Sequence, residues 1–129
     1  METGSKKCVE EEVTKERTAK HVGSGSLEVY ATPSMIALME YTSTECIKEF
    51  LEEGQTSVGT ALNVKHVSAT PVGMKVRCES ELIKVDGRAL TFSVKVYDEK
   101  GLIGEGEHQR FIVDGEKFIK KTYGKFDSI

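Results

Sequence analysis

Three residues of this 129-residue chain could together carry acid–base or nucleophilic chemistry: Thr32, Glu40 and His66. Glu40 lies in the most apolar stretch of the sequence. A carboxylate there must be paired or must have a raised pKa, unless it faces a solvent-filled groove. His66 lies on the same predicted strand face as several apolar residues. A lone inward histidine is more often a core residue than a catalyst, so each residue alone also has a structural interpretation.

A long central helix is predicted to position Thr32 and Glu40. Thr32 is the predicted N-cap, because its hydroxyl can accept a hydrogen bond from a backbone N–H of the first turn. Pro33 would then occupy the first helical position, where its missing N–H costs nothing. Gly54 is the predicted residue just beyond the helix end. The first half of the helix is apolar almost all round, which is typical of a helix enclosed by other structure.

The spacing of the three residues favours a common site. Eight residues separate Thr32 from Glu40, which corresponds to roughly 12 Å along a helix. Helical side chains lean toward the N-terminus, so the remaining gap is somewhat shorter but still too long for a direct hydrogen bond. The imidazole of His66 would fit between the hydroxyl and the carboxylate, in the geometry of a nucleophile, a base and an orienting group.

Everything after this helix is predicted to form a meander of about four long antiparallel strands, because the apolar residues alternate. Asp86 followed by Gly87 is a strong signal for a tight hairpin. Gly104 and Gly106 indicate a bulge or a close backbone approach in the last strand. The residues predicted to face the helix are Val58, Leu62, Val64, His66, Met74, Val76, Cys78, Ser80, Leu82, Leu90, Phe92, Val94 and Val96.

The predicted elements favour one architecture. Residues 1–12 are expected to be a flexible N-terminus, and residues 13–129 a single domain that begins with a strand over residues 13–21. One helix cannot cover both faces of the sheet, and an exposed sheet edge invites pairing. We therefore predict an α+β hotdog fold, in which one long central helix is wrapped by a curved antiparallel sheet. Two copies are expected to join edge to edge as a homodimer or as a dimer of dimers.

Composition and charge argue against several other classes. Hydrophobic residues make up 38% and charged residues 30%, as in globular proteins, and the formal net charge of −3 disfavours nonspecific nucleic-acid binding. We expect no membrane span, because no apolar run approaches about 20 residues, and no signal peptide at the charged N-terminus. The three cysteines and three histidines are widely spaced, so we expect a cytoplasmic protein without disulfides and without a metal site.

Two segments resemble the fluoroacetyl-CoA thioesterase family of hotdog proteins. The run ATPSMIALMEYTS, residues 31–43, contains the Thr at the helix start and the Glu eight residues later. The run GTALNVKHVSATPVGMKV, residues 59–76, follows Val58 and matches the pattern V-G-T-x-x-x-V-x-H-x-x-A-T-P-x-G without a gap. The similarity continues through residues 81–88 and 104–110, and it covers roughly residues 30–118.

This resemblance implies a catalytic set of Thr32, Glu40 and His66, with Gly59 and Arg110 at the substrate site. His66 would be the base. Glu40 would orient it or activate water, and Thr32 would attack the thioester or position a water molecule. No cofactor is expected, because coenzyme A is part of the substrate. Residues 21–30 lack the Phe residues that close the site of the fluoroacetate-specific member, so we expect a short-chain acyl-CoA in general as the substrate.

Two other functions remain open at this stage. A hotdog enoyl-CoA hydratase would place an Asp and a His in the loop that leads into the central helix, where this chain offers Glu28 and Thr32. A non-catalytic protein that binds acyl-CoA or another small ligand would keep the pocket and the dimer, yet it would not need all three candidate residues. Release of the CoA thiol would distinguish the thioesterase from both alternatives.

Overall fold

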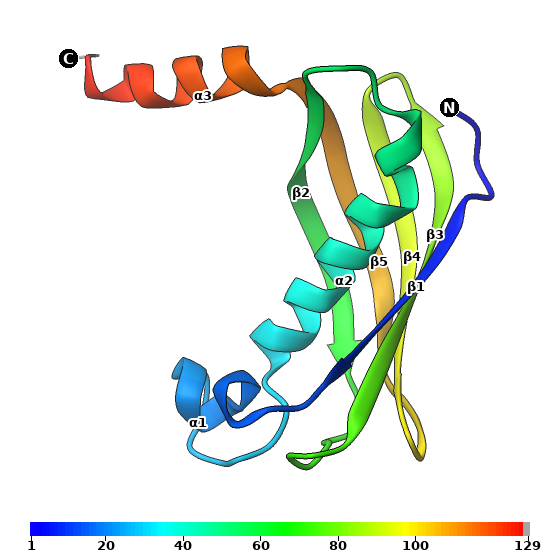
Figure 1. Cartoon of the computed structure of the whole chain (residues 1–129), viewed down its shortest axis with the longest axis vertical. Helices are drawn as coiled ribbons and strands as arrows, with labels where there is room; N and C mark the ends of the chain where they lie inside the picture. Colours follow the sequence, from blue (N-terminus) through cyan, green and yellow to red (C-terminus); the bar gives the residue numbers. More distant parts are fainter. Residues whose placement is uncertain (128–129) are drawn as a thin grey trace.

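A curved five-stranded antiparallel sheet wraps a central helix in the computed structural model, which describes residues 1–127 (Figure 1). This arrangement confirms the predicted α+β architecture with one long central helix. Within the described residues, no helix is long and apolar enough to cross a membrane. The helices and strands are β1 (Lys6–Glu12), α1 (Ala19–Val22), α2 (Thr32–Ile47), β2 (Gln55–His66), β3 (Lys75–Asp86), β4 (Ala89–Asp98), β5 (Gly101–Asp114) and α3 (Gly115–Tyr123).

The central helix α2 begins one residue earlier than its predicted cap implies. Ala31 is the N-cap and Thr32 is the first helical residue, so the prediction of Thr32 as N-cap is wrong. Its hydroxyl is engaged by His66 and makes no capping hydrogen bond. The predicted end at Gly54 is also wrong, because α2 ends at Ile47 and passes through a short 3-10 turn into extended backbone at Leu51. Gly54, with a φ of 82°, lies in the turn before β2.

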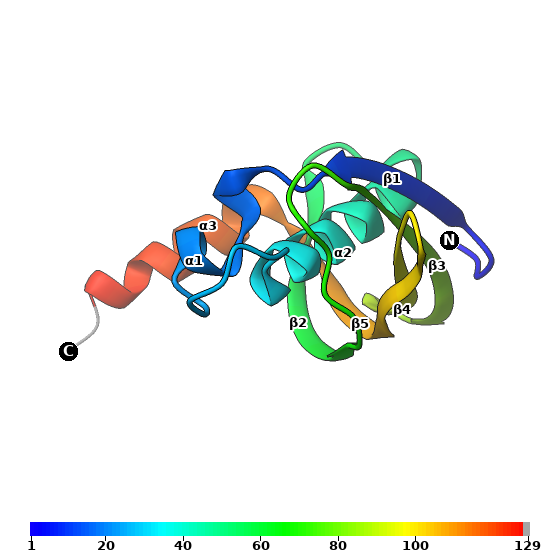
Figure 2. The same ribbon diagram turned by 90° about the horizontal axis from the view of Figure 1, so that it is seen from below.

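The strands follow the order β1-β3-β4-β5-β2 across the sheet, and all neighbours are antiparallel. The meander prediction therefore holds for β3, β4 and β5, with the expected hairpin at Asp86 and Gly87. It is wrong for β2, which pairs with β5 at the far edge of the sheet and not with β3. The connection between β2 and β3 therefore crosses the end of the sheet that lies near the start of α2 (Figures 1 and 2).

The N-terminal segment is ordered differently from the prediction. Lys6–Glu12 forms β1, an edge strand that pairs with β3, so residues 1–12 are not simply a flexible end. The prediction of a strand over residues 13–21 is wrong, since a 3-10 turn and the short helix α1 occupy this region. Charged residues dominate β1. An edge strand with little buried surface lacks the apolar alternation on which the sequence prediction depended.

Most of the predicted inward positions are confirmed. Buried residues on β3 and β4 include Val76, Cys78, Ser80, Leu82, Leu90, Phe92, Val94 and Val96. The exception lies on β2, where a bulge between Gly59 and Ala61 shifts the register by one residue. Ser57 is therefore buried where Val58 was expected, whereas Leu62, Val64 and His66 keep the predicted inward face.

The glycines of β5 lie where the chain packs most closely. A Cβ atom added at Gly104 would overlap the thioether of Met35 on α2, and one added at Gly106 would overlap the carbonyl oxygen of Asn63 on β2. Both overlaps confirm the predicted close backbone approach. The absence of side chains at these positions allows α2 and β2 to lie against β5.

The contact at Gly104 leads to a stability prediction. Gly104→Val should lower the free energy of unfolding by about 1–3 kcal/mol or more, because the new methyl groups must displace Met35 in a packed core. Gly124→Ala is the matched control, since a Cβ atom there meets nothing within 4 Å. Urea unfolding of both variants measures the difference. Equal stability of the two variants would contradict the proposed close packing.

Candidate active site

Thr32 and His66 form a hydrogen-bonded pair at one end of the molecule. Thr32 begins α2 and His66 ends β2, and the Thr32 Oγ1 atom lies 2.7 Å from the His66 Nδ1 atom. The pair borders a hollow of about 290 Å³ that is also lined by Tyr30 and by the segment 67–69. The ring of Tyr30 packs edge-on against the His66 imidazole, with 6.5 Å between the ring centroids. These contacts fix the imidazole against the start of the helix.

The second ring nitrogen of His66 is buried. Among residues 1–127, the Nε2 atom has no hydrogen-bond partner. Burial lowers the pKa of His66 below its usual value, although the backbone of Ser68 offsets part of this shift. The imidazole therefore stays neutral at neutral pH and can accept a proton, which is the requirement for a general base. A buried ring nitrogen normally has a hydrogen-bond partner, so the Nε2 atom needs one from outside the described chain.

Glu40 belongs to a different cluster, centred on the buried guanidinium of Arg110. The Arg110 Nε atom donates to the Ser57 hydroxyl at 2.8 Å, and its Nη2 atom donates to the Ser57 carbonyl oxygen at 2.9 Å. Its Nη1 atom lies 3.4 Å from the Glu40 Oε2 atom. This ion pair explains how a carboxylate is accommodated within an apolar stretch of helix. The Glu40 side chain retains 40% exposure, so it also reaches a surface.

Gly59 completes this second cluster. A Cβ atom at Gly59 would lie 2.8 Å from the Glu40 Oε2 atom and 3.4 Å from the Arg110 Nη1 atom. Gly59 also lies opposite Arg110 in the register of β2 and β5. The structure thus brings together Gly59, Arg110 and Glu40, three of the five residues selected from the sequence.

Within one chain, the predicted placement of the His66 imidazole between Thr32 and Glu40 is wrong. The imidazole contacts Thr32 only, and the carboxylate contacts Arg110. The reason is that β2 contacts α2 at two points that lie far apart along the strand. Its first half passes Glu40 at Gly59, whereas its last residue, His66, reaches Thr32. Seven residues of extended strand separate these two points by roughly 23 Å.

Two members of the Arg110 cluster, Ser57 and His108, were not identified from the sequence. The His108 Nδ1 atom lies 2.9 Å from the Ala61 carbonyl oxygen, and its Nε2 atom lies 3.2 Å from the Arg110 Nη1 atom. Because a guanidinium can only donate, the Nε2 atom must accept and His108 must be neutral. His108 and Arg110 are two residues apart in the sequence GEGEHQR, residues 104–110, so strand alternation puts them on one face and could have indicated their contact. Nothing local marked Ser57, because the bulge determines its orientation.

The buried His108 and the half-buried His66 should make stability depend on pH. Burial lowers the pKa of His108, and the charge of Arg110 lowers it further, although the Ala61 hydrogen bond opposes these effects. The pKa of His66 is lowered as well. As pH falls below about 7, the unfolded chain binds protons first. The free energy of unfolding should therefore fall between pH 7.5 and 5.5, by up to about 1.4 kcal/mol per pH unit for each histidine.

Urea unfolding at several pH values between 5.5 and 7.5 measures this dependence. His108→Gln should reduce the slope, because the glutamine has no proton to bind. The exposed His21 provides the matched control, and His21→Gln should keep the full slope. A stability that is constant over this range would show that neither histidine is held neutral by the fold.

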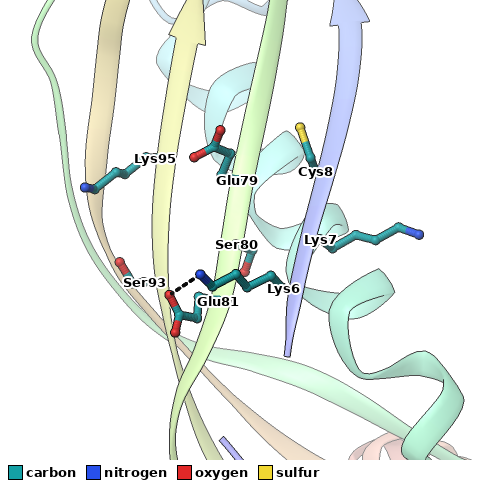
Figure 3. Close-up of a pocket in the computed structure, with 8 residues that line it drawn as sticks. All are labelled: Lys6, Lys7, Cys8, Glu79, Ser80, Glu81, Ser93 and Lys95. Carbon is teal, nitrogen blue, oxygen red and sulfur yellow. Dashed lines mark ion pairs between the residues drawn. The ribbon is translucent and has the colours of Figure 1, made fainter. Parts of the chain in front are cut away.

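A larger hollow of about 560 Å³ lies elsewhere, over β1, β3 and β4 (Figure 3). Its charged side chains are lysines on β1 and β4 and glutamates on β3, and Lys6 pairs with Glu81 at 3.9 Å. None of the five candidate residues lines it. This hollow is therefore not the candidate site.

In the part of the chain that the structure describes, no group of three or more His, Cys, Asp or Glu residues is placed to hold a metal ion.

Comparison with known proteins identifies the family. The family model described as fluoroacetyl-CoA-specific thioesterase matches residues 13–116. A fluoroacetyl-CoA thioesterase of Streptantibioticus cattleyicolor is 41% identical over 98 residues, which cover 76% of this chain and 70% of the relative.

Solved structures agree with this comparison. The fluoroacetyl-CoA thioesterase FlK superimposes with a TM-score of 0.91 at 34% identity, over 97% of both chains. A thioesterase superfamily member from Thermus thermophilus superimposes with a TM-score of 0.88 at 28% identity, over 99% of this chain and 97% of that one. The resemblance found in the sequence is confirmed, and the chain belongs to the fluoroacetyl-CoA-specific thioesterase family and has the hotdog fold.

Proposed function

We propose that this chain is a thioesterase that hydrolyses a short-chain acyl-CoA to the free acid and coenzyme A, at a site that two copies complete. The observation that carries the proposal is the Thr32–His66 pair, with its buried Nε2 atom, beside a hollow. Thioester hydrolysis needs an oxygen nucleophile, a base and a group that stabilises the developing oxyanion. The family relationship supports the same reaction.

The Thr32–His66 pair can supply the base and the nucleophile. The oxygen of Thr32, or of a water molecule that Thr32 positions, attacks the thioester carbonyl carbon while His66 accepts its proton. The C–S bond then breaks, and the CoA thiolate takes up a proton as it leaves. If Thr32 attacks, water subsequently hydrolyses the acyl ester. The positive end of the α2 dipole lies beside Thr32 and stabilises the negative charge that develops there.

A homodimer would supply the missing partner of His66. The strand β2 is an edge strand of 12 residues, and its inward-facing Leu62 is 39% exposed. The other edge strand, β1, is shorter and rich in Lys and Glu, which discourage edge pairing. Pairing of two β2 strands about a two-fold axis perpendicular to the sheet is antiparallel. It brings the Gly59 half of one strand toward the His66 end of the other.

In such a dimer the two clusters form one composite site. Glu40, Gly59 and Arg110 of one copy would face Thr32 and His66 of the second copy. The Glu40 carboxylate, whose side chain is 40% exposed, would then lie near the His66 imidazole. A turn of this ring would bring its buried Nε2 atom, which has no partner within the described chain, to that carboxylate. This arrangement restores the predicted catalytic set across the interface. The dimer, the residue roles and the composite site are parts of this proposal.

The acyl group is proposed to be short but not restricted to fluoroacetyl. The segment before α2 contributes Ala19, Ser24, Val29 and Tyr30 to the hollow, and no Phe. The hydroxyl of Tyr30 donates to Glu11 at 2.7 Å, so this aromatic ring is held in place. We also propose a cytoplasmic location, which the three free thiols of the described chain support.

Thiol release from a panel of short-chain acyl-CoA substrates tests the activity. The wild-type chain should release CoA thiol, whereas a hydratase or a binding protein would not. His66→Ala should lower kcat by roughly 100-fold or more, because it removes the base. His21→Ala is the control for loss of an exposed imidazole and should retain full activity. Full activity of His66→Ala, with an unchanged Tm, would remove His66 from the mechanism.

Mixing two inactive variants tests the composite site. His66→Ala and Glu40→Gln should each be inactive alone. In a mixed dimer, one site carries both changes and the other carries neither, so an equal mixture that exchanges subunits should recover about one quarter of wild-type activity. A site formed within one chain would recover none. Light scattering at micromolar concentration checks the mass, which should be that of a dimer or of a dimer of dimers.

A further inference from the structure

The C-terminal helix α3 has an apolar face that its own chain leaves uncovered. None of its nine described residues is buried. Ile119 is 55% exposed, Tyr123 is 62% exposed, and Phe126 in the following 3-10 turn is 86% exposed. These residues lie at helical positions i, i+4 and i+7, on one face. The opposite face carries Lys117 and Lys121. A strongly amphipathic helix of this kind needs an apolar surface to cover it.

The start of α3 is fixed at the start of β2. The Gly115 N–H donates to the Gly54 carbonyl oxygen at 2.9 Å, and Gly54 directly precedes β2. Asp114 caps the helix by accepting a hydrogen bond from the Lys117 N–H. From this point α3 runs past the β2 edge and away from the sheet, as both views show (Figures 1 and 2). It therefore extends on the side where the second copy would pair.

The length of this helix suits a contact across the dimer. The nine residues of α3 and the three of the following turn extend roughly 18 Å at about 1.5 Å per residue. Strands in a sheet lie about 4.8 Å apart. The helix can thus reach across the first strands of a second copy whose β2 pairs with this one.

Antiparallel pairing determines which part of the second copy α3 meets. The start of one β2 lies beside the end of the other, so α3 approaches the segment that follows His66 of the second copy. In that segment Val67 is 54% exposed and Val72 is 39% exposed. Val67, Ser68 and Ala69 also line the hollow beside Thr32 and His66. Two uncovered apolar surfaces would therefore meet at the candidate site.

We propose that α3 of one copy packs its apolar face on residues 67–72 of the second copy and forms a wall of that copy's Thr32–His66 hollow. The inference rests on the proposed dimer and goes beyond it, because it assigns a third element from the opposite copy to each site. The helix would limit the space for the acyl-CoA substrate and exclude water from one side of the thioester.

Cysteine crosslinking between the two surfaces tests this contact. In a Cys8→Ser background, which removes the exposed native thiol, Val67→Cys is combined with Ile119→Cys. A short bismaleimide should give a covalent dimer in high yield. It cannot join the two positions within one chain, because the 12 residues of β2 separate them by roughly 36 Å. Lys121→Cys with Val67→Cys is the matched control on the opposite helix face and should give little crosslink.

The outcomes separate this inference from the proposed function. Equal crosslinking of the Ile119 and Lys121 variants, or none by either, would overturn the α3 contact even if mixed variants recover activity. A monomeric mass together with failed complementation would overturn the dimer and this inference with it.

A second measurement uses dimer dissociation upon dilution. Ile119→Ser with Tyr123→Ser should raise the dissociation constant roughly tenfold or more, since it removes two apolar anchors from the interface. Lys117→Ser with Lys121→Ser is the matched control and should leave it unchanged. Unchanged dissociation in the Ile119 and Tyr123 variant would contradict the contact.

Discussion

The pairing of β2 with β5 is the constraint on which the candidate site depends. It places Gly59 opposite Arg110 and His66 opposite Gly104, so one strand carries both clusters. It also makes β2 an edge strand, which leaves one side of the site open. The glycines of β5 permit this pairing, because side chains at Gly104 and Gly106 would overlap α2 and β2. Close packing of the backbone thus determines where the chemistry lies.

The second constraint is the burial of Arg110, which is only 7% exposed. A buried guanidinium is tolerated when its donors are satisfied, and here Ser57, His108 and Glu40 accept its hydrogen bonds. The same contacts hold His108 neutral and fix the position of the Glu40 carboxylate. The bulge after Gly59 turns Ser57 inward to meet Arg110. The cluster therefore has a partner for each Arg110 nitrogen and a fixed orientation of the guanidinium beside Glu40.

The two histidines illustrate how the same direction of pKa shift can accompany different roles. Both have a lowered pKa, chiefly because burial disfavours the charged imidazole. The nitrogens of His108 are engaged by Ala61 and Arg110, which is typical of a structural role. His66 keeps one nitrogen without a partner in the described chain, beside a hollow. The difference in hydrogen bonding, and not in pKa, distinguishes the candidate base from the supporting histidine.

The sequence by itself determined the central helix, the alternation of β3 and β4, the hairpin at Asp86 and Gly87, and the residues Thr32, Glu40 and His66 as candidates. These features depend on residues close together in the chain, where turn chemistry and apolar periodicity act. Tertiary structure alone decided that β2 pairs with β5, that Thr32 bonds His66 and that Glu40 bonds Arg110, 70 residues away. It also decided the placement of α3. Pairings between distant segments depend on bulges, on close backbone contacts and on which edge of the sheet a strand joins. A pattern of neighbouring residues in the sequence does not predict these features.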